Sequence, residues 1–214
     1  MVMKYPKLRE LGEAIRALFT GPYTTKFPKV PHVPAKKFRG KPVPDDEWCV
    51  GCTACKEVCP TGAIEVHDDA EKGIRTIIRR YDKCIFCGQC ELYCITERGV
   101  RLTQEYDLAT FDRSTLYVEQ QKELLVCDRC GAVIGAKQHI LWLIHKLGPL
   151  AYSNLPLMLV SQEELKVAEV PREKITMEKP VTRQDMFRIL CPKCRHEVLI
   201  YDTYARRIET TDDK

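Results

Sequence analysis

The sequence predicts an α+β fold in which two cysteine-rich repeats form the centre of the chain. A helix and an extended arm precede them, and a further cysteine-bearing extension follows. Three observations predict this: twelve cysteines fall into tight groups, one run of four cysteines recurs, and short stretches of helix and strand character separate the groups. We divide the chain into residues 1–44, residues 45–108 and residues 109–214.

The cysteines are expected to bind metal in a reducing, cytosolic setting. The opening MVMKYPKLRE has no apolar core of a secretory signal. Closely spaced C-x-x-C pairs suit metal ions better than disulfides. The most apolar stretch, HILWLIHKLGPLAYSNLPLMLV, is interrupted by His145, Lys146, Gly148 and Pro149, whereas a spanning helix needs about 20 mostly apolar residues.

A short amphipathic helix is predicted near the start of the chain. Its apolar residues recur at helical spacing, and Gly21-Pro22 ends the pattern. They are Leu8, Leu11, Ile15, Leu18 and Phe19. This face either packs on the chain's own core or docks on a membrane surface or a partner subunit.

A proline-rich arm follows in GPYTTKFPKVPHVPAKKFRGKPVP. Proline fixes the backbone and lacks an N–H, so this segment cannot form a helix or a central strand. It should be extended and stiff, and Lys36, Lys37, Arg39 and Lys41 make it basic. It is either a solvated linker or an arm laid across a neighbouring protein.

The motif C-x2-C-x2-C-x3-C occurs twice, in CVGCTACKEVC and in CIFCGQCELYC. In the bacterial two-cluster ferredoxin pattern the fourth cysteine of each run ligates the other run's [4Fe–4S] cluster. We therefore predict a two-[4Fe–4S] ferredoxin fold. One cluster is assigned to Cys49, Cys52, Cys55 and Cys94, and the other to Cys84, Cys87, Cys90 and Cys59. The alternative of two zinc sites fits less well, because zinc usually takes two knuckles per ion.

Such clusters transfer electrons and do no substrate chemistry unaided, because cysteine fills every iron position; we therefore expect a non-catalytic, electron-transferring chain. Each half should supply a loop, a short helix and a strand, and IRTIIRRYD is the expected strand before the second loop.

Pro60 follows Cys59 as the pattern requires, but Ile95 follows Cys94. The cluster held by Cys94 is thus expected to differ in potential from its neighbour.

A second kind of site is predicted in the extension. Cys127, Cys130, Cys191 and Cys194 form two C-x-x-C knuckles that are compatible with one tetrahedral ion. We favour structural zinc in a zinc-ribbon-like arrangement, with a rubredoxin-like iron as the alternative. An apolar helix is expected around Gln138 to Leu147, a charged and poorly patterned stretch over residues 162–184, and a disordered tail over residues 206–214.

The formal charge of +4 treats every cysteine as neutral. Two four-thiolate clusters and one four-thiolate divalent ion each contribute about −2, which brings the total to about −2. The basic balance of the bare chain is therefore no argument for binding nucleic acid, and no nucleic-acid partner is expected.

The order GEAIRALFTGPYTTKFP, KKFRGKP and two cluster runs resembles the two-cluster ferredoxin-like subunit of respiratory complex I. Membrane-bound [NiFe] hydrogenases and formate hydrogenlyases share that subunit. The segment LYVEQQKELLVCDRCG, an apolar helix and CPKC are similar to the C-terminal extension of formate hydrogenlyase subunit 6.

The resemblance implies a relay at the cytoplasmic side of the cell membrane, in peripheral contact with a membrane module. Electrons would come from a soluble ferredoxin or a dehydrogenase subunit and pass to the small subunit of a hydrogenase-like pair of large and small subunits. A membrane-arm subunit would be a further partner, and hydrogen evolution the expected outcome.

Other functions stay open at this point. The chain could be the equivalent subunit of a sulfur- or quinone-reducing complex, or a soluble polyferredoxin carrier, which would need neither the helix nor the arm. A zinc-ribbon regulatory protein is a third possibility, although base-stacking aromatic residues are not grouped in the basic arm.

Overall fold

The computed structural model describes residues 7–167 and 183–209, with only the backbone for residue 183 and residues 201–209. The chain divides into two compact units, one ending at Phe38 and the other beginning at Arg39. Among the described residues, no helix combines the length and the apolar character that crossing a membrane requires.

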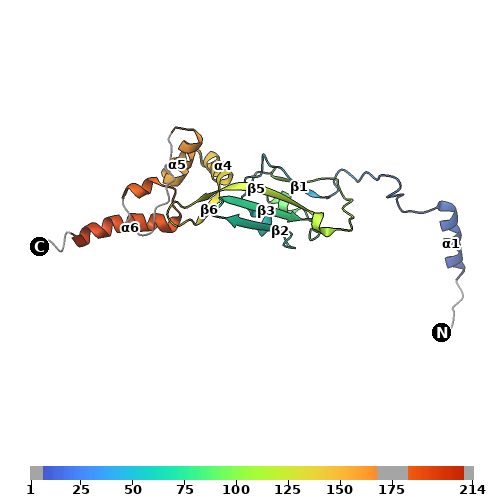
Figure 1. The fold of residues 1–214 in the computed structure, drawn as a ribbon. Coiled ribbons are helices and arrows are strands. Elements are labelled where there is room, and N and C mark those ends of the chain that lie inside the picture. Colours follow the sequence, from blue (N-terminus) through green and yellow to red (C-terminus); the bar gives the residue numbers. More distant parts are fainter. Residues whose placement is uncertain (1–6, 168–182, 210–214) are drawn as a thin grey trace. The chain divides into compact units, whose positions relative to one another are not determined.

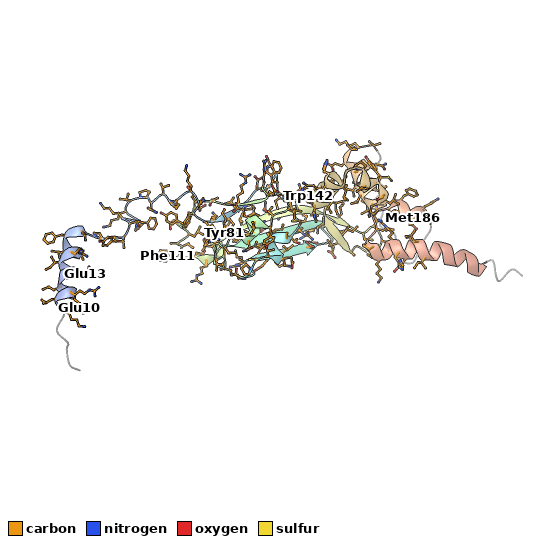
Figure 2. All side chains as sticks on the ribbon, turned by 180° about the vertical axis from the view of Figure 1, so that it is seen from behind. Glu10, Glu13, Tyr81, Phe111, Trp142 and Met186 are labelled. Atoms are coloured by element: carbon orange, nitrogen blue, oxygen red, sulfur yellow. The ribbon has the colours of Figure 1, made fainter. Side chains whose placement is uncertain are left out.

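The first unit contains the predicted helix, α1 (Leu8–Thr20), which ends at Gly21. The Glu10 carboxylate accepts a hydrogen bond from the backbone N–H of Lys7 at 3.0 Å, which closes the first turn. Glu10 and Glu13 lie on its polar side (Figure 2), and none of its residues is buried within this unit. After the helix, residues 22–38 form turns and extended chain without helix or strand, as predicted for these residues, while the stiffness of the arm stays a prediction.

The second unit is a mixed helical and sheet structure (Figure 1). Its sheets are a two-stranded pair, β1–β4, and a four-stranded antiparallel sheet in the order β2–β3–β5–β6. The strands are β1 (Pro42–Pro44), β2 (Ile64–Asp69), β3 (Ile74–Arg80), β4 (Val100–Leu102), β5 (Tyr117–Val126) and β6 (Val133–Ala136). The helices are α2 (Ala54–Glu57), α3 (Gln89–Leu92), η1 (Arg113–Thr115), α4 (Lys137–Leu147), η2 (Gly148–Ser153), α5 (Leu155–Glu164), η3 (Arg183–Phe187) and α6 (Pro192–Glu209).

Both repeats fold as predicted, each with a cysteine loop, a one-turn helix and a strand: α2 and β2 in the first, α3 and β4 in the second. The stretch IRTIIRRYD supplies β3. Among the described residues, strand β1 pairs only with β4, with Pro42 opposite Leu102. Its two prolines are tolerated because this strand lies at an edge, where an N–H can be missing.

Strand β5 joins the extension to the repeats. It pairs with β3 along its first part, with Gln120 opposite Ile77, and with β6 near its end. One sheet therefore runs across the predicted boundary between residues 108 and 109, while the three-segment division itself stays a prediction. The coarse fold class is confirmed, since a ferredoxin-like cysteine region lies within a mixed helix and sheet structure.

Helix α4 confirms the helix predicted around Gln138 to Leu147. Helix α4 lies against β5 and β6, and helix α5 lies against α4 (Figure 1). A buried apolar core of Leu125, Val160 and Ile189 joins these elements. The stretch predicted to be poorly patterned begins inside α5, and its residues 168–182 lie outside the described part. The prediction of a disordered tail is wrong for residues 206–209, because α6 continues through them on residues that favour helix, and residues 210–214 are not described.

Gly40 is a position where a side chain cannot fit. An added Cβ would lie 2.3 Å from the carbonyl oxygen of Glu105 and 2.7 Å from that of Thr103, and both atoms belong to the backbone. We expect Gly40→Ala to lower the free energy of unfolding by about 1–3 kcal/mol, the usual cost of overpacking. Urea unfolding of the second unit measures this. Gly135→Ala in the same unit is the control, because its added Cβ would lie 3.8 Å from the Ile140 side chain, an ordinary contact, and equal effects of the two changes would contradict the prediction.

Candidate iron–sulfur and metal sites

Two cavities lie beside the sheet, and each is lined by four cysteines. The first is lined by Cys49, Cys52, Cys55 and Cys94. The second is lined by Cys84, Cys87, Cys90 and Cys59. Each cavity thus gathers three cysteines of one run and the fourth cysteine of the other, the same grouping as in the predicted ligand sets. The ligation itself stays a prediction.

The two exchanged cysteines have matching surroundings. The Cys94 sulfur lies 3.3 Å from the Thr96 hydroxyl, and the Cys59 sulfur lies 3.7 Å from the Thr61 hydroxyl. Burial alone would raise the pKa of both thiols. Hydrogen bonds from these hydroxyls and from nearby backbone N–H groups outweigh burial and lower the pKa of Cys59 and Cys94. Both side chains are therefore prepared to act as thiolate ligands.

The other cluster thiols lie in a less favourable setting for negative charge. Burial raises the pKa of Cys52, Cys55 and Cys84, and it raises that of Cys90 to about 11. Thiolates at these positions need a positive partner in the cavity. A cationic iron–sulfur core would supply it.

The spacing of the thiols sets the site of the extension apart from the two cavities. In the part of the chain that the structure describes, the only group of three or more ligand atoms within 4.8 Å of one another is the set from Cys127, Cys130, Cys191 and Cys194. The cysteines of the two cavities form no such compact group among the described residues, and the [4Fe–4S] prediction for them stays a prediction.

Two arginines that sequence reasoning did not single out as functional hold the cysteine loops. Arg75 on β3 donates to the Gly51 carbonyl in the first loop at 2.7 Å, while Asp68 binds the same guanidinium. Arg39 donates to the Cys87 carbonyl in the second loop at 3.0 Å. The sequence signal for Arg75 was a charged residue that shares a strand face with Ile77.

Tyr81, labelled in Figure 2, directly follows β3 and lines the second cavity. Its hydroxyl donates to the Pro42 carbonyl at 3.0 Å and so fastens β1 beside the second cysteine loop. Burial raises the pKa of Tyr81 to about 12, so the phenol stays protonated and remains a donor at neutral pH.

The four cysteines of the extension form a compact site. Cys127 and Cys130 lie in the turn between β5 and β6, and Cys191 and Cys194 lie at the start of α6. The sulfurs of Cys130 and Cys191 are 3.7 Å apart. A tetrahedron with metal–sulfur bonds of about 2.3 Å has sulfur–sulfur edges of about 3.8 Å, so the arrangement fits one ion. Figure 2 shows Met186 beside α6, where it packs on this site.

Asp128, which lies between Cys127 and Cys130, links the first knuckle to the segment that precedes the second. Its backbone N–H donates to the Ile189 carbonyl, and its carboxylate accepts from the Ile189 N–H, both at 3.0 Å. Arg129 binds Glu197 of α6, while its Nε is buried without a partner among the described residues. Burial raises the pKa of Cys130 and Cys194, but backbone N–H groups outweigh burial at Cys127 and lower its pKa.

These sites define a class of protein, the electron-transferring iron–sulfur proteins with two [4Fe–4S] clusters. Residues 48–97 match the family described as 4Fe-4S dicluster domain. The chain belongs to the family of iron–sulfur subunits that includes formate hydrogenlyase subunit 6. The Escherichia coli protein of that name is 33% identical over 125 residues, which cover 58% of this chain and 69% of that protein. The predicted resemblance is thus confirmed.

Subunits of quinone-reducing enzymes are also similar. NADH-quinone oxidoreductase subunit I 2 of Geobacter metallireducens is 28% identical over 130 residues, 57% of this chain and 98% of that protein. The NAD(P)H-quinone oxidoreductase subunit I of Gloeobacter violaceus is 31% identical over 100 residues, which are 44% of this chain. The match spans 47% of that protein, about half of its length. A chain of an archaeal membrane-bound sulfane sulfur reductase superposes with a TM-score of 0.39 and 29% identity, over 54% of this chain and 62% of its own length.

Proposed function

We propose that this chain is the electron-relay subunit of a membrane-bound oxidoreductase related to complex I. The observation that carries the proposal is the pair of neighbouring cavities, each lined by four thiols drawn from both runs. A [4Fe–4S] cluster held in each would take up and release one electron at a time. The relatives of this chain include subunits of formate hydrogenlyase and of quinone oxidoreductases. This supports a fixed place for the chain in a multi-subunit complex.

The chain's own residues shape this relay. Arg75 and Arg39 donate to the two loop carbonyls, and the hydroxyls of Thr96 and Thr61 lie within hydrogen-bond distance of the sulfurs of the exchanged cysteines. Hydrogen bonds to ligand sulfurs are among the factors that set a cluster's potential. Because Ile95 lines the first cavity in place of the usual proline, we propose that the two clusters differ in potential.

In the finer form of the proposal, a soluble ferredoxin or a dehydrogenase subunit donates electrons at the cytoplasmic side of the membrane. The clusters pass them to the small subunit of a hydrogenase-like pair, for hydrogen evolution. The four-cysteine site of the extension holds structural zinc, which would supply no redox chemistry. A sulfur- or quinone-reducing complex is the second candidate, favoured by the quinone oxidoreductase relatives.

Affinity purification of the tagged chain from native membranes tests this proposal. Copurification with a large subunit that binds nickel through cysteine pairs would select hydrogen evolution, and a nickel-free homologue would select the alternative. Recovery of the chain alone from the soluble fraction, with both clusters and rapid exchange with diverse carriers, would support a soluble polyferredoxin instead.

The apolar face of α1 is expected to attach the chain to its complex. Ile15→Glu, on this face, should release most of the chain from the membrane fraction while its iron content stays unchanged, because the cluster cavities belong to the second unit. Quantitative immunoblotting of membrane and soluble fractions measures the release. Arg16→Glu, on the polar face of the same helix, is the matched control. An Ile15→Glu chain that stays bound like wild type would contradict this role.

A further inference from the structure

Three cations lie on the face of the β3–β5 sheet that backs the cysteine cavities, and they differ in their partners. Arg75 forms a bidentate ion pair with Asp68. Lys122 lies 3.7 Å from the Asp46 carboxylate and donates to the Asp46 carbonyl at 2.8 Å. Arg79 is more deeply buried, with 2% of its surface exposed, yet no carboxylate of the described residues pairs with it.

Arg79 contributes to the lining of both cysteine cavities. Its Nη1 donates to the Gln120 side-chain oxygen at 2.7 Å, and its Nη2 lies 3.8 Å from the sulfur of Cys55. Its Nε is buried and has no hydrogen-bond partner among the described residues. The Gln120 amide nitrogen donates in turn to Asp46 at 2.5 Å, which turns the amide oxygen toward Arg79 and fixes the guanidinium.

A buried cation without an opposite charge costs several kcal/mol, so a folded chain keeps one only where a counter-charge is close. Each [4Fe–4S] cluster with four thiolates carries about −2 in its oxidised state. Clusters bound at the two sites would therefore supply the negative charge that no carboxylate of the described residues brings to this arginine. The unpartnered Nε is also a donor that a cluster or ligand sulfur would satisfy.

We propose that Arg79 is a fixed positive charge shared by the two cluster sites, and that it raises their reduction potentials, most strongly that of the cluster bound by Cys55. Reduction adds one electron and no proton, so the cluster becomes more negative. A nearby cation stabilises the reduced form more than the oxidised form. The effect is larger at the Cys55 cluster because Arg79 contacts a ligand sulfur there.

This inference rests on the two-cluster assignment of the proposed function, so the experiment counts the clusters first. Purified Arg79→Gln and Arg79→Met chains are analysed for iron and then titrated potentiometrically, with each cluster followed by its electron paramagnetic resonance signal. Both changes remove the charge and keep a side chain of similar reach. We expect about eight cluster irons, as in wild type. The equilibrium for reducing the Cys55 cluster should weaken at least tenfold, about 59 mV for a one-electron couple, and the other cluster should shift less.

Two matched variants separate charge from packing. Arg79→Lys keeps the charge, so the reduction potential of the Cys55 cluster should stay close to the wild-type value. Gln120→Leu removes the hydrogen-bond acceptor of the guanidinium but leaves its charge, so this potential should shift little. Unchanged potentials in both neutral variants, or an equal shift in Gln120→Leu, would overturn the proposal. The neutral variants could fail to assemble any cluster. In that case, an Arg79→Lys chain that keeps both clusters supports the role of Arg79 as a counter-charge, and an Arg79→Lys chain that also loses them refutes this role. Too little iron in wild type would instead refute the two-cluster assignment.

Discussion

Replacing Cys49 and Cys94 together is expected to remove one cluster, about four iron atoms, and no more than either replacement removes alone. Replacing Cys49 and Cys59 together is expected to remove both clusters. The physical reason is that Cys49 and Cys94 line the first cavity, whereas Cys59 lines the second. Two substitutions at one cluster cannot add their effects, because the first already releases it.

Iron analysis of the purified alanine variants, together with their electron paramagnetic resonance spectra, measures this pattern. The signal that disappears in Cys49→Ala also identifies which spectrum belongs to the first cavity. Val50→Ala, in the same loop but without a ligand atom, is the control and should keep about eight cluster irons. Loss of a single cluster in the Cys49 and Cys59 double variant would show that each run binds its own cluster.

Cys194→Ala is expected to release the metal ion of the extension and to unfold the start of α6, while both [4Fe–4S] clusters remain. The buried core at this site consists largely of the predicted ligands Cys127, Cys191 and Cys194, together with Leu190 and Val198. Without an ion, little apolar surface holds the two knuckles together. Structural zinc contributes about 10–16 kcal/mol of apparent binding energy in small zinc domains, so we expect a loss of several kcal/mol here.

Metal analysis, limited proteolysis near residue 191 and the cluster spectra measure these effects in one preparation. Lys193→Ala is the matched control, because this exposed residue lies between the same two cysteines without supplying a ligand. Zinc in the wild-type protein would support a structural staple, and iron with a rubredoxin-like spectrum would support the alternative. A Cys194→Ala chain that keeps one equivalent of metal and its protease resistance would contradict the assignment.

Much of the local structure could be predicted because the signals lie within a few residues of one another. The spacing of Leu11, Ile15 and Leu18 predicted α1, and IRTIIRRYD was the strand expected before the second loop, which is β3. The cysteine runs predicted the grouping of thiols that the two cavities show, including the exchange of Cys59 and Cys94. The tail was misjudged because its charged residues resemble a solvated end, although they also favour the continuation of α6.

The sequence by itself determined the cysteine spacing, the repeat, the amphipathic helix and the family resemblance, because each depends on contacts or patterns within one short segment. Only the tertiary structure decided that β5 extends the sheet of the repeats and that Gln120 reaches Arg79. It also placed Arg79 beside both cavities and brought Asp128 of the first knuckle into hydrogen bonds with the segment before the second. Pairing between distant strands sets the contacts of Arg79 and Gln120, and packing of distant segments sets that of Asp128; neither depends on one segment alone.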